Sequence, residues 1–303
     1  MSPLGRMVLA ITSRPEVRRL FTERSLGRRL AMRFVAGESL DEAVAVARRL
    51  NRREMSVSLD HLGEHVTDPD MAVRAQKDYV ACLERIGAEG LDANVSIKLS
   101  QLGLGLDAAL AGEAVEELST KAGEVGTTVT IDMEESRYTE ATVELFARLQ
   151  PRLGNLGVAL QSYLHRTDAD LERVLSLGGH LRLCKGAYDE PPEVAYQSKR
   201  EVDESYDGLL RRVMAAETTC PAVATHDEAR IDLARRLAGS RNEPFEFQML
   251  YGIRRRLQDR LVKEGFPLRI YVPYGAQWYP YLTRRLAERP ANLFFFLRAV
   301  LGR

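Results

Sequence analysis

Charged side chains that could take part in chemistry recur at the ends of short β-like segments. Lys98 follows "NVSI", Asp132 follows "TVTI", and Arg182 and Lys185 lie in "HLRLCKGAY". Burying such charges costs free energy unless they pair with one another or meet a charged ligand. The pattern therefore predicts a cluster of paired charges that receives a charged or polar substrate.

A second set of charges follows the last β-like segment, in "RIYVPYGAQWYPYLTRRLAE" (269–288). Tyr281, Arg284, Arg285 and Glu288 have the three- and four-residue spacing that places side chains on one side of a helix. Guanidinium groups suit bidentate recognition of a carboxylate. If this helix covers the site, the two arginines are expected to hold a substrate carboxylate.

Other chemistries have weaker signals. "GLGLDA" (103–108) fits the G-x-G-x-x-A pattern of a dinucleotide site, with Gly103 and Gly105 at the turn. A Rossmann first strand is usually apolar up to its glycines, whereas Lys98, Ser100 and Gln101 precede these. An ordinary loop is favoured, and a nicotinamide-dependent dehydrogenase stays open as an alternative.

Metal and nucleophile sites are not expected. His61 and His65 are four residues apart but stand beside "LGE" at a segment end, not in a helical HExxH motif. There is no G-x-S-x-G motif, and Cys184 alternates with its neighbours inside a strand-like run. Cys82, Cys184 and Cys220 form no CxxC pair and are expected to be small buried residues in a reducing cytosol.

The elements that must position these residues alternate regularly. Helix-like stretches separate eight β-like segments, a pattern typical of a (βα)8, TIM-like barrel. We expect an N-terminal helical arm over residues 1–54, a catalytic barrel over 55–303, and a C-terminal helix covering the barrel mouth. The β-like segments span residues 56–64, 94–103, 127–136, 156–164, 180–188, 221–227, 245–252 and 269–275.

Each segment begins apolar and becomes polar towards its end, which predicts one shared site, because barrel active sites lie at the carboxyl ends of the strands. The polar residues are Asp60, Lys98, Asp132, Gln161, Arg182, Lys185, Thr225, His226, Gln248 and Tyr271.

Composition narrows the class of protein. The chain has 303 residues, of which 45% are hydrophobic and 28% charged, and Lys+Arg equals Asp+Glu at 43 each. This balance argues against a nucleic-acid-binding protein. Residues 1–53 hold twelve arginines against five acids, a net charge of +7, so the rest carries −7. A basic arm could dock on an anionic membrane, or it could be the solvated face of packed helices.

Several motifs, in order over roughly residues 55–300, resemble those of the proline dehydrogenase (proline oxidase) family. They are "SIKLSQLG", "IDMEES", "LRLCKGAY", "PAVATHD" and "RIYVPYG…W…YLTRRLAE". The resemblance is to the monofunctional bacterial form. It implies a barrel with non-covalent FAD that oxidises L-proline to 1-pyrroline-5-carboxylate and passes electrons to membrane quinone. It also implies a cytoplasmic protein with peripheral contact at the inner membrane face, and a downstream pyrroline-carboxylate dehydrogenase as a partner.

The resemblance assigns roles residue by residue. Asp132 and Arg182 are expected to be catalytic, with Arg182 stabilising the charge that develops on the flavin. The expected substrate contacts are Lys98, Tyr188, Leu250, Tyr271, Arg284 and Arg285. The expected cofactor contacts are Met133, Gln161, Lys185, Gly186, Ala187, Thr225, His226 and Glu288.

Three departures from the family pattern stand out: Arg289 after Glu288, Cys184 in place of a more usual valine, and "ATHD" in place of "ATHN". None changes the expected chemistry, although Arg289 bears on the adenosine end of the cofactor. Two further alternatives remain open. One is a barrel flavoenzyme for another cyclic amino acid such as hydroxyproline, and the other is a binding module that works through residues 1–53 alone.

Overall fold

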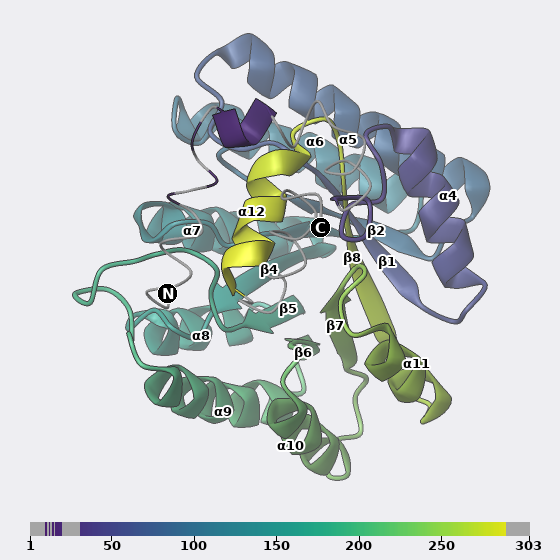
Figure 1. Cartoon of the computed structure of the whole chain (residues 1–303). Helices are drawn as coiled ribbons and strands as arrows, with labels where there is room; N and C mark the ends of the chain where they lie inside the picture. Colours follow the sequence, from purple (N-terminus) through teal and green to yellow (C-terminus); the bar gives the residue numbers. More distant parts are fainter. Residues whose placement is uncertain (1–9, 11, 13, 15, 20–30, 289–303) are drawn as a thin grey trace.

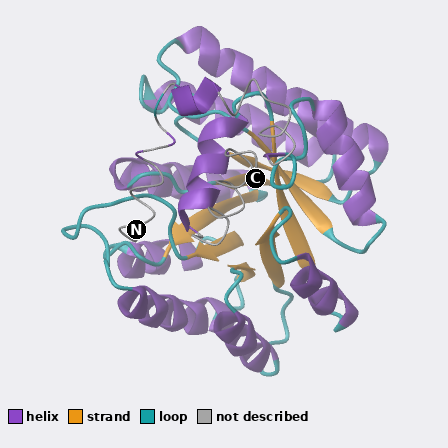
Figure 2. Cartoon of the chain, viewed as in Figure 1, coloured by secondary structure: helices purple, strands orange, loops and turns teal. Residues whose placement is uncertain are grey.

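Eight parallel strands close into a barrel in the computed structural model, which describes residues 10, 12, 14, 16–19 and 31–288 (Figures 1 and 2). The strands pair in chain order, and β1 also pairs with β8 to close the sheet. This confirms the expected fold class. The strands are β1 (Ser56–His61), β2 (Ala93–Ile97), β3 (Val129–Ile131), β4 (Leu156–Gln161), β5 (Gly179–Cys184), β6 (Thr219–Ala224), β7 (Glu246–Leu250) and β8 (Leu268–Tyr274).

Helices surround the sheet, and the carboxyl ends of the strands open on one side. The described helices are α4 (Leu40–Asn51), α5 (Pro69–Glu89), α6 (Ala108–Glu124), α7 (Ser136–Leu153), α8 (Thr167–Leu175), α9 (Lys199–Ala215), α10 (Glu228–Ala238), α11 (Arg255–Lys263) and α12 (Trp278–Glu288).

Local sequence explains where the helices begin. Asp68 accepts a hydrogen bond from the Asp70 amide and Pro69 takes the first turn of α5, a residue order typical of a helix start. Ser39 and Glu42 form a reciprocal capping box at the start of α4. These caps satisfy amide groups that the helices themselves cannot pair.

Helix α4 lies in the outer ring, although it precedes the first strand. It packs against β1 and β8, and Ala43, Ala47 and Leu50 belong to the main hydrophobic core (Figure 1). The place beside β8 in the ring is therefore filled from the N-terminal side. This arrangement leaves α12, which follows β8, available for a different position.

That position is over the mouth of the barrel, as expected. Trp278, Leu282 and Leu286 of α12 share a second hydrophobic cluster with Phe34 and Val35. The Trp278 indole also donates a hydrogen bond to Glu38 at 3.0 Å. The segment before α4 thus fixes the helix that carries Arg284 and Arg285.

Among the described residues, none of the helices has the length and apolar character that crossing a membrane requires.

Candidate active site

A cavity of about 600 Å³ opens at the carboxyl ends of the strands, beneath α12. We call it the mouth cavity. Fifteen of the sixteen predicted site residues line it; the sixteenth, Glu288, ends α12, and its side chain lies outside the described residues. The fifteen are Lys98, Asp132, Met133, Gln161, Arg182, Lys185, Gly186, Ala187, Tyr188, Thr225, His226, Leu250, Tyr271, Arg284 and Arg285.

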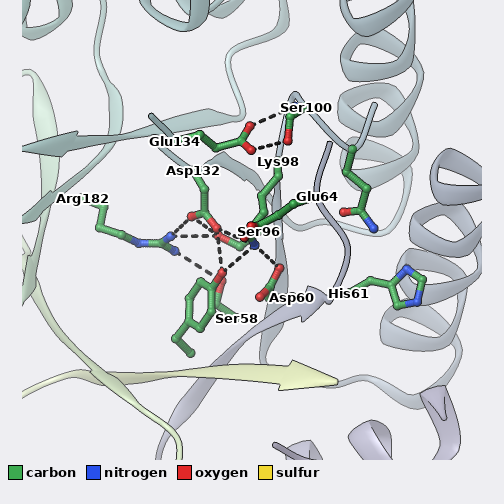
Figure 3. Close-up of polar contacts among 12 residues, drawn as sticks. Ser58, Asp60, His61, Glu64, Ser96, Lys98, Ser100, Asp132, Glu134 and Arg182 are labelled. Atoms are coloured by element: carbon green, nitrogen blue, oxygen red, sulfur yellow. Dashed lines mark hydrogen bonds and ion pairs between the residues drawn. The ribbon is translucent and has the colours of Figure 1, made fainter. Parts of the chain in front are cut away.

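The floor of the mouth cavity is a buried network around Asp132 (Figure 3). One Asp132 oxygen accepts from Arg182 and from Ser96, and the other accepts from the Tyr271 hydroxyl at 2.6 Å. The Lys98 ammonium lies 3.4 Å from that second oxygen. Asp132 therefore pairs with both cations, as the sequence predicts, and keeps the positive charges in place.

Arg182 reaches across the barrel. Its guanidinium donates to Gln248 at 2.6 Å and to Ser96 at 2.8 Å, besides pairing with Asp132. Contacts from three other strands or strand ends fix its orientation. A fixed guanidinium of this kind supplies positive charge without reorganisation when negative charge develops nearby.

Asp60 is a site residue that the sequence assignment missed. One of its oxygens lies 2.5 Å from the Lys98 ammonium, and the other is buried without a hydrogen-bond partner. The carboxylate faces the mouth cavity from the end of β1. Its position in the series of polar strand ends was the available signal.

The neighbouring charges affect the two carboxylates differently. Burial raises the pKa of Asp60, and the nearby Lys98 only partly offsets this. Burial alone would also raise the pKa of Asp132, but Lys98 and Arg182 outweigh it and hold that pKa below its usual range. For Lys98, burial favours the neutral form, yet Asp60 and Asp132 outweigh it and raise the pKa well above the ordinary value.

Arg284 and Arg285 of α12 line the mouth cavity from above. Glu64, in the loop after β1, accepts two hydrogen bonds from Arg284 at 2.6 and 2.8 Å. The Arg284 guanidinium also lies 6.0 Å from the centre of the Tyr188 ring, and that of Arg285 lies 5.3 Å from the Tyr281 ring. Burial lowers the pKa of Arg284, but the charge and hydrogen bonds of Glu64, together with Tyr188 and Asp60, outweigh it, so the net shift is upward. Glu64 is a second residue that the sequence assignment missed.

A series of hydrogen bonds joins the carboxyl ends of four successive strands, β2, β3, β4 and β5. The Gln161 side chain donates to the backbone carbonyl of Glu134 at 2.8 Å and accepts from the Ala187 amide at 3.1 Å. The Glu134 carboxylate accepts from the amide and hydroxyl of Ser100. Burial raises the pKa of Glu134 to about 7. This chain of contacts fixes the loops that carry much of the cavity wall.

Lys185 and Gly186 shape another wall. The Lys185 ammonium pairs with Asp203 at 2.5 Å and with Asp227 at 2.8 Å. Gly186 has a φ of +137°, and a Cβ there would lie 2.3 Å from the Tyr163 ring. Only glycine fits this position, because a side chain would clash with Tyr163 behind the turn of residues 185–187 that lines the mouth cavity.

The structure offers no support for a dinucleotide site at Gly103 and Gly105. Gly103 packs against Leu110, where a Cβ would come within 2.8 Å, and Asp107 caps α6 with its own carboxylate. That helix end therefore already has an anion, and its loop is not part of the cavity wall. Gly103, the first glycine of the "GLGLDA" pattern, thus has a packing explanation.

The cysteines and histidines partly depart from expectation. Cys82 is buried, but Cys184 and Cys220 are only half-buried, and Cys184 lines the mouth cavity. Burial raises the pKa of Cys184 to about 12, which disfavours the nucleophilic thiolate. His65 approaches Glu134 and Glu135 with ligand-type atoms within 4.8 Å of one another, but Ser100 occupies both Glu134 oxygens.

Comparisons with known proteins point in one direction. The protein-family model described as "Proline dehydrogenase" matches residues 43–298 of this chain. Proline dehydrogenase of Deinococcus radiodurans is 39% identical over 302 residues, covering 97% of this chain and 96% of the relative. Proline dehydrogenase 2 of Bacillus subtilis (strain 168) is 37% identical over 281 residues, covering 91% of this chain and 92% of the relative.

Longer proteins match over part of their length. Bifunctional protein PutA of Escherichia coli is 30% identical over an alignment of 320 positions, which covers 89% of this chain and 24% of that protein. The crystal structure of proline utilization A from Bdellovibrio bacteriovorus, inactivated by N-propargylglycine, superposes with a TM-score of 0.80 at 23% identity. The superposition covers 93% of this chain and 36% of that one, and it shows that the two share a fold.

Proposed function

The chain belongs to the proline dehydrogenase family, and from this premise we propose that it oxidises L-proline to 1-pyrroline-5-carboxylate with non-covalent FAD as the hydride acceptor. The match in length to the Bacillus and Deinococcus relatives fits the monofunctional form. The observation that carries the proposal is the mouth cavity, where two α12 guanidiniums lie over a buried network of charges.

Arg284 and Arg285 are proposed to bind the carboxylate of proline. Both line the mouth cavity, and guanidinium groups form short, charge-assisted hydrogen bonds to carboxylates. Lys98 adds a third positive charge on the floor. Together they fix the ring in one orientation, which is the positional part of catalysis.

Tyr188, Leu250 and Tyr271 are proposed to border the proline ring. All three line the mouth cavity, and the Tyr271 hydroxyl is held by Asp132. The combination of two aromatic rings and one aliphatic side chain suits a small, mainly apolar ring. A hydroxylated ring would need a polar partner here. Hydroxyproline is therefore the alternative substrate that stays within the same class of flavoenzyme.

The cavity residues fit FAD. The volume of about 600 Å³ lies within the range of cofactor sites, and residues 185–187 line the cavity. Met133, Gln161 and Lys185, with Gly186, Ala187, Thr225, His226 and Glu288, are the residues proposed to hold it. When bound, FAD supplies the two-electron acceptor that oxidation of an amine requires.

Asp132 and Arg182 are proposed as the catalytic residues of the chain. Arg182 holds positive charge at the cavity wall, and Asp132 fixes both Arg182 and Lys98. Because the network is buried, its charges act in a medium of lower dielectric constant than water and are strong. Their fixed geometry would favour negative charge in the cavity as hydride leaves the substrate.

The electrons are proposed to pass to a membrane quinone, which requires peripheral contact with a membrane. Residues 1–54 are proposed as an arm packed on a catalytic unit of residues 55–303, with the basic charge of residues 1–53 available to an anionic surface. Much of this arm lies outside the described residues. The downstream pyrroline-carboxylate dehydrogenase, which the resemblance to the family implies, is a proposed partner.

Adding L-proline to the purified yellow protein without oxygen tests the proposal. We expect the blue absorption of the flavin to bleach, and 1-pyrroline-5-carboxylate to form in equal amount. A colourless protein that oxidises proline only with added nicotinamide dinucleotide would favour the alternative at Gly103 and Gly105. Faster bleaching by hydroxyproline than by proline would favour the other cyclic amino acid.

A further inference from the structure

Asp60 has no role in the function proposed so far, yet its surroundings are unusual. Its side chain is fully buried at the end of β1 and faces the mouth cavity. One oxygen lies 2.5 Å from Lys98, while the other has no hydrogen-bond partner. A buried carboxylate oxygen left in this way costs free energy, so a proton or a ligand is expected to satisfy it at some stage.

Lys98 links Asp60 to the rest of the network. Its ammonium lies 2.5 Å from Asp60, 3.4 Å from Asp132 and 3.2 Å from the Tyr271 hydroxyl. Lys98 therefore forms a bridge between the two carboxylates. A proton that reaches Lys98 from the mouth cavity has a direct path to Asp60.

The two carboxylates are not equivalent as proton acceptors. Two cations hold Asp132 in its charged form, whereas burial makes the charged form of Asp60 unfavourable. Where neighbouring groups are pushed apart in this way, the one with the raised pKa is the better store for a proton. The charged and titratable groups that act on Asp60 or feel its charge are Lys98 after β2, Asp132 after β3, Tyr271 and Tyr274 on β8, Tyr79 on α5 and Arg284 on α12.

Oxidation of the proline amine needs a group that accepts a proton. Near neutral pH the amine of free proline is protonated, and the carbon–nitrogen double bond of the product requires the nitrogen lone pair. One proton must therefore leave the nitrogen before or during oxidation. Lys98 cannot take it alone, because it already carries its full complement of protons.

We propose that Asp60 takes up, through Lys98, the proton that the amine of bound proline releases. This inference rests on the proposed function. Lys98 passes one of its protons to the Asp60 carboxylate and receives the amine proton in its place. The nitrogen–hydrogen bond of the substrate breaks, an oxygen–hydrogen bond forms on Asp60, and the charge on Lys98 is unchanged. Asp60 acts through Lys98, so it is a positioning and proton-holding residue.

Asp60→Asn tests this role, with Asp170→Asn as the matched control. Asp170, on α8, is also a buried, paired aspartate, 5% exposed and 2.8 Å from Arg166 just before that helix, but it lies outside the mouth cavity. The readout is the rate of flavin bleaching by saturating L-proline without oxygen, measured at several pH values. Flavin absorbance before proline is added reports that each variant is folded and loaded.

We expect Asp60→Asn to bleach about 100-fold more slowly than wild type near pH 7, the scale of a lost proton acceptor. The deficit should shrink as pH rises, because proline then arrives with a neutral amine. Asp170→Asn should match wild type at every pH. A wild-type rate in Asp60→Asn, or a deficit of equal size at every pH, would overturn the proposal.

Two observations keep the test decisive. If wild-type protein fails to bleach with proline, the proposed function itself fails, which is distinct from a loss confined to Asp60→Asn. If Asp60→Asn does not fold, infrared spectra of wild type serve instead. A protonated-carboxyl band should appear with proline and not with cyclopentanecarboxylate, which lacks the nitrogen; its absence with proline would overturn the role of Asp60.

Discussion

Two arginine doublets of this chain have the same composition and opposite surroundings. Arg284 is 20% exposed in its side chain and pairs with Glu64, itself 16% exposed, above the mouth cavity. Arg212, in the Arg211–Arg212 doublet of α9, pairs with Asp168 and Glu172, which are 78% and 72% exposed. Arg284 and its partner are thus both shielded from water, whereas Arg212, itself 31% exposed, pairs with carboxylates that lie in solvent.

The difference shows why residue type alone does not identify a site. Exposed ion pairs gain little, because water and salt screen them and side-chain entropy opposes them. Buried pairs pay a large desolvation cost, so removing one partner leaves an uncompensated charge. A buried cation that faces a cavity can recover part of that cost by binding an anion. Substitutions in the two doublets should therefore have very different effects.

The largest effect is expected for Arg285→Met. Removing one partner of a charge-assisted contact to a carboxylate costs roughly 2–5 kcal/mol, which is about 30-fold to several-thousand-fold in apparent affinity for proline. The fold should persist, because Leu282 and Leu286 still anchor α12. Steady-state measurement of the apparent affinity checks this; an unchanged value would remove Arg285 from the carboxylate site.

A loss of similar size but in a different quantity is expected for Arg182→Ala. The variant loses the fixed charge that Gln248, Ser96 and Asp132 hold in the cavity. We expect flavin bleaching by saturating proline to slow by about 100- to 1,000-fold, the scale of one preorganised donor. Stopped-flow absorbance measures it, and bleaching at full speed would exclude this role.

A pH effect on stability is expected from Glu134. Its folded-state pKa of about 7 lies above the ordinary 4.5, so the folded state holds this proton more tightly than the unfolded state does. Its contribution is fully present below about pH 4.5 and is lost as pH rises through 7, by up to ~3 kcal/mol. Denaturant unfolding at several pH values should show this slope reduced in Glu134→Gln. An identical slope in the variant and wild type would contradict the assignment.

The smallest effect is expected for Arg212→Ala, because both carboxylates that pair with Arg212 are exposed. Its two pairs on the outer ring should contribute less than ~0.5 kcal/mol to the free energy of unfolding. Proline affinity and bleaching rate should equal those of wild type. A drop comparable to that of Arg285→Met would mean that burial does not separate the two doublets.

Much of the fold could be predicted, because its signals are local. The eight apolar segments, the Asp68–Pro69 helix start and the polar strand ends all follow from periodicity and capping chemistry. The position of Cys184 was predicted less well. Alternation in β5 suggested a core residue, but its side chain forms part of the cavity wall.

The residues that line the mouth cavity could be predicted where several motifs agreed, and they were missed where a residue depends on a distant partner. Glu64 meets Arg284 across 220 positions of sequence, so no local pattern marks it. Asp60 was visible as a polar strand end, but its unpaired oxygen and its contact with Lys98 exist only in the folded barrel. Glu134 was hidden beside Glu135, since only packing decides which of two adjacent carboxylates is buried.

The central claim is that Arg284 and Arg285 bind the carboxylate of proline. Its most direct test is the ratio of kcat/KM for L-proline to that for L-prolinamide. Prolinamide keeps the ring and the amine but lacks the carboxylate charge. The ratio should be large in wild type and in Arg212→Ala, and it should fall by about 30-fold or more in Arg285→Met. A ratio that is the same in wild type and Arg285→Met would contradict the account.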